Sequence, residues 1–130
     1  MDRFKSFAFV VSVLLGTQVS AQGEGMLPLP SGRAVHLQEI LSNQPGNDGL
    51  TSHFRFIAEG MDPQEDWSED MLYLCETYAL SRVAGQVPQP RQIVISLADQ
   101  AVPFGEAAPD AVQLFEAYYP EENHCIWEMF

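Results

Sequence analysis

Apolar residues recur at steps of three and four between residues 67 and 83, and this stretch is the clearest amphipathic helix in the chain. Its apolar stripe consists of Trp67, Met71, Leu74, Cys75 and Tyr78. Because these positions lie on one side of a helix with 3.6 residues per turn, we expect them to face the core.

Two starts compete for this helix. Asp62 with Pro63 makes a plausible N-cap and first position. Ser68 as the N-cap instead places Trp67 and Leu72 in staple positions, and acidic residues then follow near the positive end of the helix dipole. We prefer the start at Ser68, with a single turn before it.

Alternating apolar and polar residues predict two strands, at residues 34–41 and 50–58, joined by a Gly- and Pro-containing turn at residues 43–49. Glu39 interrupts the apolar side of the first strand. If the two apolar faces coincide, the register of the hairpin is fixed. The opposing pairs are then Leu41 with Leu50 and Leu37 with Phe54.

The second half of the chain predicts three further elements. Residues 91–97 are the most apolar strand, which indicates a central position with burial on both faces. Residues 109–119 are predicted to form a second helix that ends at Pro120. Its stripe would consist of Ala111, Leu114, Phe115 and Tyr118. Residues 124–130 form the last strand, with Cys125, Trp127 and Met129 on one side.

The predicted order is therefore strand, strand, helix, strand, helix, strand, within a single domain of residues 31–130. This order favours an α+β fold with a small sheet of about four strands and two helices packed on one face. A right-handed crossover through the second helix could make the last two strands parallel. Residues 22–30 are rich in Gly and Pro, and we predict that they form a flexible leader.

The first 21 residues have the pattern of a secretory signal peptide. Arg3 and Lys5 form a basic start, residues 7–15 are apolar, and small residues end at Ala21. We predict cleavage after Ala21, a periplasmic or secreted location, and no stable membrane insertion after cleavage. An uncleaved N-terminal anchor is the alternative.

Charge narrows the range of partners. Cleavage after Ala21 would reduce the six basic and 18 acidic side chains to four and 17, a formal charge of −13, with no lysine left. Nucleic acid and anionic lipid surfaces are bound through clustered Lys and Arg, so both are poor partners for this chain, and we predict that it does not bind nucleic acid.

Cys75 and Cys125 are the only cysteines. Export leads to an oxidising compartment and the spacing is not CxxC, so we predict a structural disulfide between them rather than a redox pair. The closed loop of about 50 residues would contribute roughly 4 kcal/mol through chain entropy, as an upper estimate.

Familiar catalytic and cofactor motifs are absent from the sequence, among them GxSxG, HExxH, GxGxxG and GxxxxGK. His36 and His53 lie about one diagonal step apart in the expected register, but zinc sites usually need three or four ligands. Acidic side chains are so numerous that close pairs arise by chance; the candidates are Glu106, Asp110 and Glu116, and separately Glu39. We therefore predict no catalytic residues, no metal and no cofactor.

The candidate binding site is a loop at residues 99–108, after the central strand, where sites are commonly grafted. Its candidate residues are Phe104, Gly105 and Glu106. Large aromatic side chains elsewhere could line a groove, although in a domain of this size they are more often core. These aromatics are Trp67, Tyr118, Tyr119, Trp127 and Phe130.

Four blocks resemble a family of short exported Gram-negative bacterial proteins classed only as a domain of unknown function. The blocks are LCETYAL at 74–80, QIVISL at 92–97, VPFGEAAP at 102–109 and CIWEMF at 125–130. The resemblance implies an envelope location and supports pairing of Cys75 with Cys125. It implies no activity.

The sequence thus predicts an exported, acidic, non-catalytic module that binds an unknown protein or small ligand through the loop of residues 99–108. The alternative is a small periplasmic hydrolase that works through carboxylates or a histidine-bound metal.

Overall fold

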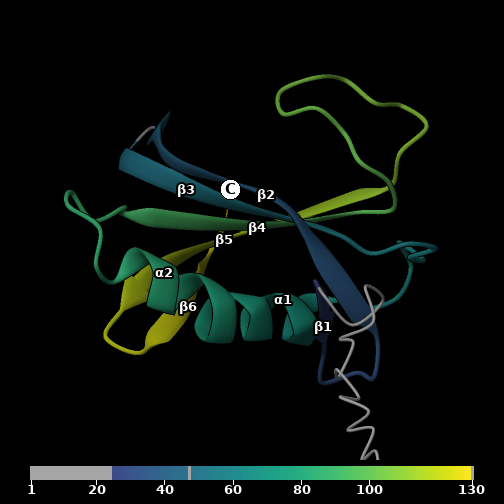
Figure 1. The fold of residues 1–130 in the computed structure, drawn as a ribbon, viewed down its shortest axis with the longest axis horizontal. Helices are drawn as coiled ribbons and strands as arrows, with labels where there is room; N and C mark the ends of the chain where they lie inside the picture. Colours follow the sequence, from purple (N-terminus) through teal and green to yellow (C-terminus); the bar gives the residue numbers. More distant parts are fainter. Residues whose placement is uncertain (1–24, 47, 130) are drawn as a thin grey trace, which may run out of the picture.

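The structure, a computed structural model, describes residues 25–46 and 48–129 and is mostly β (Figure 1). One curled, half-barrel sheet contains six strands. They are β1 (Met26–Pro28), β2 (Ala34–Gly46), β3 (Gly49–Ile57), β4 (Gln92–Ala98), β5 (Gln113–Glu121) and β6 (His124–Glu128). The predicted signal segment and its cleavage site lie outside the described residues.

Strands follow one another in the sheet in chain order, from β1 to β6. Every neighbouring pair is antiparallel except β3 and β4, which are parallel. A parallel pair needs a crossover, and here the crossover is the helical segment that covers one face of the sheet (Figure 1). The two strands predicted to be joined by a second crossover, at residues 91–97 and 124–130, are β4 and β6. They are not neighbours, because β5 lies between them and pairs antiparallel with each.

The predicted α+β fold with four strands and two helices is wrong, because residues 109–119 do not form a helix. Most of this segment is β5, in which the aromatic residues Phe115, Tyr118 and Tyr119 favour a strand. Pro120 is compatible with the strand because it lies beyond the last β4–β5 pair, Ile93 with Tyr118, where no ladder donor is needed.

Residues 22–30, predicted to form a flexible leader, contain the edge strand β1, in which Leu27 pairs with Val35 of β2. The turn after β1 is fastened to the helix. Ser31 donates hydrogen bonds from its backbone N–H (3.1 Å) and its hydroxyl (2.5 Å) to the buried carboxylate of Asp70. The guanidinium of Arg33 lies 4.0 Å from the ring centre of Trp67. The N-terminal edge of the sheet is therefore held against the helix.

The predicted register of the first hairpin is also wrong. β2 runs on to Gly46 and contains two bulges, between Leu37 and Glu39 and between Leu41 and Gln44. The observed pairs are Leu37 with Phe56, Leu41 with His53 and Pro45 with Leu50. Each bulge inserts residues that have no partner, so the alternation of faces changes along β2. Asn43, in the second bulge, has a positive φ of 54°, which Asn tolerates better than most residues.

The predicted amphipathic helix is confirmed. It runs through α1 (Ser68–Leu74), the π-helical turn η1 (Cys75–Ala79) and α2 (Leu80–Val83). Its start agrees with the prediction to within one residue, since Trp67 occupies the N-cap position and Ser68 is the first helical residue. Of the predicted stripe, all members are buried except Tyr78, which is half-buried.

The core lies between this helix and one face of the sheet. β4 is central and buried on both faces, as predicted. Phe54, Phe56, Ile93, Ile95 and Leu97 supply the sheet side of the core, opposite Met71, Leu74, Ala79 and Val83 of the helix. The side of the sheet away from the helix, which we call the open face, is covered only in part, by the loop between β4 and β5 (Figure 1).

Candidate binding sites

The open face carries the candidate loop. Along β3 and β4, residues alternate between the helix side and the open face, so His53, Arg55 and Ser96 point away from the helix. Phe115 lies opposite Ser96 on β5 and shares this face. Residues 99–112 leave β4 and arch over the same side (Figure 1).

The base of the loop is fixed by hydrogen bonds to its backbone. The carbonyl of the buried Val102 accepts one from a terminal nitrogen of Arg55 (2.7 Å) and one from the amide of Gln38 (3.0 Å). The Asp99 carboxylate accepts the backbone N–H of Val112 (3.0 Å) and so closes the two ends of the loop together. The tip is therefore presented from a rigid base.

Arg55 is buried and forms an ion pair with Glu39. From the sequence, Glu39 was expected to interrupt the apolar side of its strand. In the structure, the bulge between Leu37 and Glu39 directs Glu39 to the open face, where Arg55 lies. A buried guanidinium needs such a partner, because an uncompensated buried charge is costly. The ion pair between Arg55 and Glu39 holds both side chains in place on the sheet beneath the loop.

The tip of the loop holds the predicted binding residues. The ring of Phe104 meets His53 edge-on, with ring centres 4.9 Å apart, and lies 5.4 Å from the guanidinium carbon of Arg55. Gly105 has a positive φ of 78°, which glycine adopts without steric cost. Glu106 donates its backbone N–H to the carbonyl of Pro103 and is exposed.

A hollow of about 240 Å³ opens between the loop tip and the sheet. It is lined by His53, Arg55, Ser96, Phe104, Glu106 and Phe115, among others. Phe104 and Phe115 remain 46% and 50% exposed, so the rim is aromatic while the floor is polar. Aromatic walls with a few fixed polar groups are typical of ligand sites.

Burial, with a smaller contribution from the positive charge of Arg55, lowers the pKa of His53 below its ordinary value of 6.5. The imidazole is therefore neutral at pH 7 and presents to the hollow a group that can both donate and accept hydrogen bonds. The floor thus combines a fixed cation with a neutral polar ring.

The other candidates for chemistry do not converge. His36 pairs with Ile57 and His53 pairs with Leu41, so the two histidines lie four positions apart along the hairpin rather than on a diagonal. Glu106 is on the loop over the open face, whereas Glu116 lies on the helix side. Across residues 25–46 and 48–129, no three His, Cys, Asp or Glu side chains come together as a metal site would require.

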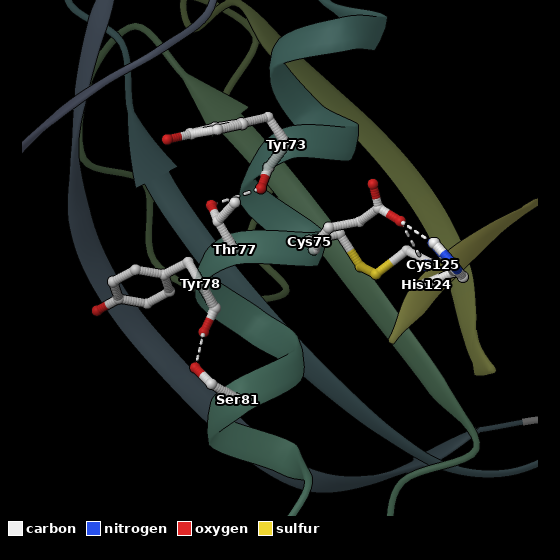
Figure 2. The surroundings of a disulfide bond; sticks show 8 residues. Tyr73, Cys75, Thr77, Tyr78, Ser81, His124 and Cys125 are labelled. Atoms are coloured by element: carbon white, nitrogen blue, oxygen red, sulfur yellow. Dashed lines mark hydrogen bonds and ion pairs between the residues drawn. A yellow bond between two sulfur atoms is a disulfide. The ribbon is translucent and has the colours of Figure 1, made fainter. Parts of the chain in front are cut away.

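Cys75 and Cys125 are joined by a disulfide, as predicted, with Cα atoms 6.2 Å apart (Figure 2). The carboxylate of Glu76 accepts the backbone N–H of Cys125 (3.1 Å) and contacts the ring of His124 (3.3 Å). The π-helical turn is therefore fastened to the start of β6 by one covalent bond and one carboxylate.

The aromatic residues considered from sequence are distributed over different surfaces. Tyr118 and Trp127 line a groove between α1 and β6, and Trp127 is 56% exposed. Trp67 is buried beside Arg33, and Tyr119 belongs to the open face. Phe130 lies outside the described residues.

Sequence reasoning missed the residues under the loop, above all Arg55 and His53 as its floor. The available signal was an arginine inside a strand otherwise rich in apolar residues, which implies a buried partner. Phe115 was missed because it was placed on a helical stripe. Neither its face nor its neighbours could be inferred without the strand register.

The chain matches a known protein family over most of its length. The model of a family of unknown function, DUF6497, matches residues 11–130. Neither a curated protein nor a solved structure matches the sequence. Within the described part of the chain, no helix combines the length and apolar character needed to cross a membrane.

Proposed function

We propose that this chain, which belongs to the DUF6497 family of unknown function, is an exported, non-catalytic module that binds a partner protein or small ligand under its β4–β5 loop. The observation that carries the proposal is the hollow at the loop tip. There the half-exposed Phe104 and Phe115 stand over a floor made by Arg55 and His53.

Three features support binding at this place. The loop spans 14 residues without a helix or strand, and loops of this length inside compact domains are usually functional. Its base is held by Arg55 and Gln38, so little ordering entropy is lost when a partner binds. Two large aromatic side chains on the lining of one hollow are left about half-exposed, and aromatic residues are enriched at the centres of interfaces.

Export is supported by the signal-like N-terminus and by the disulfide, which is typical of oxidising compartments. A non-catalytic role is supported by the engagement of the polar groups near the hollow. Arg55 is committed to Glu39 and to the carbonyl of Val102, and the ring of His53 packs against Phe104.

The test is crosslinking and affinity capture from the native periplasm with the wild type and with Phe104→Ala and Glu106→Ala. We expect both variants to stay folded, because these side chains are exposed, and to lose the captured partner at least about tenfold. Far-UV circular dichroism and the urea midpoint check the fold.

Matched controls are Tyr73→Ala, which removes a similarly exposed aromatic from the helix, and Glu59→Ala, which removes an exposed acid from another turn. Both should capture as the wild type does. Equal capture by wild type and Phe104→Ala would contradict the proposed site.

A further inference from the structure

We propose that the groove between α1 and the outer edge of β6 binds an extended, basic segment of another protein, which adds to the sheet as a strand beside β6. This site is on the helix side, away from the hollow under the loop. The groove has a volume of about 590 Å³. It is lined by Glu69 and Leu72 from α1, Glu116 and Tyr118 from β5, and Cys125 and Trp127 from β6.

The groove exists because the helix and β6 are joined at one end only. The disulfide fixes the π-helical turn η1 to Cys125, and the contacts between the helical segment and β6 are concentrated at that turn. On the N-terminal side of η1, the helix α1 lies over β4. The groove separates the start of α1 from β6. Leu72 and Tyr118 give this space an apolar floor.

Trp127 is a preformed anchor at the rim. Its indole N–H donates a hydrogen bond to the carboxylate of Glu116, while more than half of its surface remains exposed. The polar end of the ring is thus satisfied within the protein and the apolar body is free for contact. Tryptophan in such a setting is among the residues that contribute most to binding energy.

The strand edge faces the same groove. Cys125, Ile126 and Trp127 all border it, and three consecutive residues can do so only at the edge of a strand, because side chains alternate between faces. The backbone N–H of Cys125 points away from β5, toward Glu76. By the antiparallel alternation, the N–H and C=O of Trp127 point the same way.

Among the described residues, the Trp127 backbone has no hydrogen-bond partner at this outer edge. An edge of this kind can pair with an added strand, and peptide recognition by strand addition uses such main-chain bonds for affinity and side-chain pockets for specificity. Glu76 already occupies the amide of Cys125. The added strand therefore pairs beside Trp127 rather than at the start of β6.

Charge identifies the partner. The groove is lined by two acids, Glu69 and Glu116, and by no basic residue, and the chain as a whole carries a formal charge of −12. A second copy of the chain would bring the same negative charge to the interface, which costs free energy. A segment that alternates basic and apolar residues fits both the acidic rim and the apolar floor.

The test uses an eight-residue synthetic peptide that alternates lysine and valine, added to the full chain in low salt. We expect saturable binding that weakens in high salt, and at least about tenfold slower hydrogen exchange of the Trp127 amide by NMR. Two control peptides should bind at least about tenfold more weakly. One replaces lysine by glutamate, and the other carries N-methyl groups on two adjacent central residues.

Variants separate the groove from the rest of the molecule. Trp127→Ala should weaken binding about tenfold, and Glu69→Lys, which changes only an exposed helical charge, about threefold. Phe104→Ala, on the opposite face, should bind as the wild type does. The proposal is overturned by unchanged Trp127 exchange at saturation, by equal binding of the glutamate peptide, or by light scattering that shows a wild-type dimer and a Trp127→Ala monomer.

Discussion

Two arginines, Arg33 and Arg55, make contacts within the chain. Arg33 lies over Trp67 and pairs with Glu65, and Arg55 pairs with Glu39. Arg55 is buried, and a buried polar group is stable only when its hydrogen-bonding capacity is met, so this arginine fixes the segments that it contacts. Arg55 in this way determines where the β4–β5 loop lies, and through the loop the shape of the hollow.

His53 gives this hollow a pH dependence. Its pKa is lowered in the folded state, by burial first and by Arg55 second, so the unfolded chain takes up the proton at a higher pH than the folded chain. The contribution of His53 to the free energy of unfolding is therefore fully present above pH 6.5, the ordinary pKa that applies to the unfolded chain. It is lost as the pH falls from 6.5 toward the lower pKa of the folded chain.

We predict that His53→Gln reduces the loss of unfolding free energy between pH 7.5 and pH 5.5, measured by urea unfolding at a series of pH values. The control is Thr51→Val, a substitution in the same strand without a titratable group, which should keep the wild-type slope. A slope in His53→Gln as steep as that of the wild type would show that this imidazole does not titrate differently on folding.

Helices and strands with a strong local apolar pattern could be predicted from the sequence, whereas the pairing between strands could not. The helix and β4 follow from their apolar patterns, since the first has a 3.6-residue period and the second is a continuous apolar run. β5 was mistaken for a helix because Leu114 and Tyr118 are compatible with both periods. The choice between them is made by the partner strands β4 and β6, which the local pattern does not contain.

The bulges of β2 explain the failure of the register. Two insertions change which face each later residue occupies, and sequence gives no direct sign of them apart from Asn43. The same limit applies to the site. The loop carrying Phe104 was predictable from its position after a buried strand, whereas its floor of His53 and Arg55 required the register of β3.

The disulfide connects two elements that pack weakly on their own. It closes a loop of 50 residues between η1 and the edge strand β6. We predict that the double variant Cys75→Ser, Cys125→Ser loses about 2–4 kcal/mol of unfolding free energy, because the unfolded chain is no longer constrained. Urea unfolding followed by circular dichroism measures the loss.

Reduction of the wild type with dithiothreitol is the internal control for this measurement, and the reduced protein should unfold at the same urea concentration as the double variant. A loss below about 1 kcal/mol would mean that helix and edge strand are held mainly by packing and by Glu76.

Across the whole molecule, the helix and the loop cover opposite sides of one sheet, and each leaves a distinct surface open. The hollow under the loop has an aromatic rim and a polar floor in which Arg55 is paired with Glu39, whereas the groove beside β6 has an acidic rim and an apolar floor. These different linings predict different partners. Binding at one can therefore be tested with substitutions at the other as the control.

The disulfide that fastens the helix to β6 is typical of an oxidising compartment, so the structure is consistent with the predicted export. We expect the full chain, expressed in a Gram-negative host, to be recovered from the periplasm as residues 22–130. Its mass should be lower by two hydrogen atoms than that of the reduced chain, because Cys75 and Cys125 form a disulfide. Intact mass spectrometry under non-reducing conditions measures both features. Val19→Arg, which removes a small residue from the predicted cleavage site, should prevent cleavage, and an uncleaved or reduced wild-type product would contradict export through this signal.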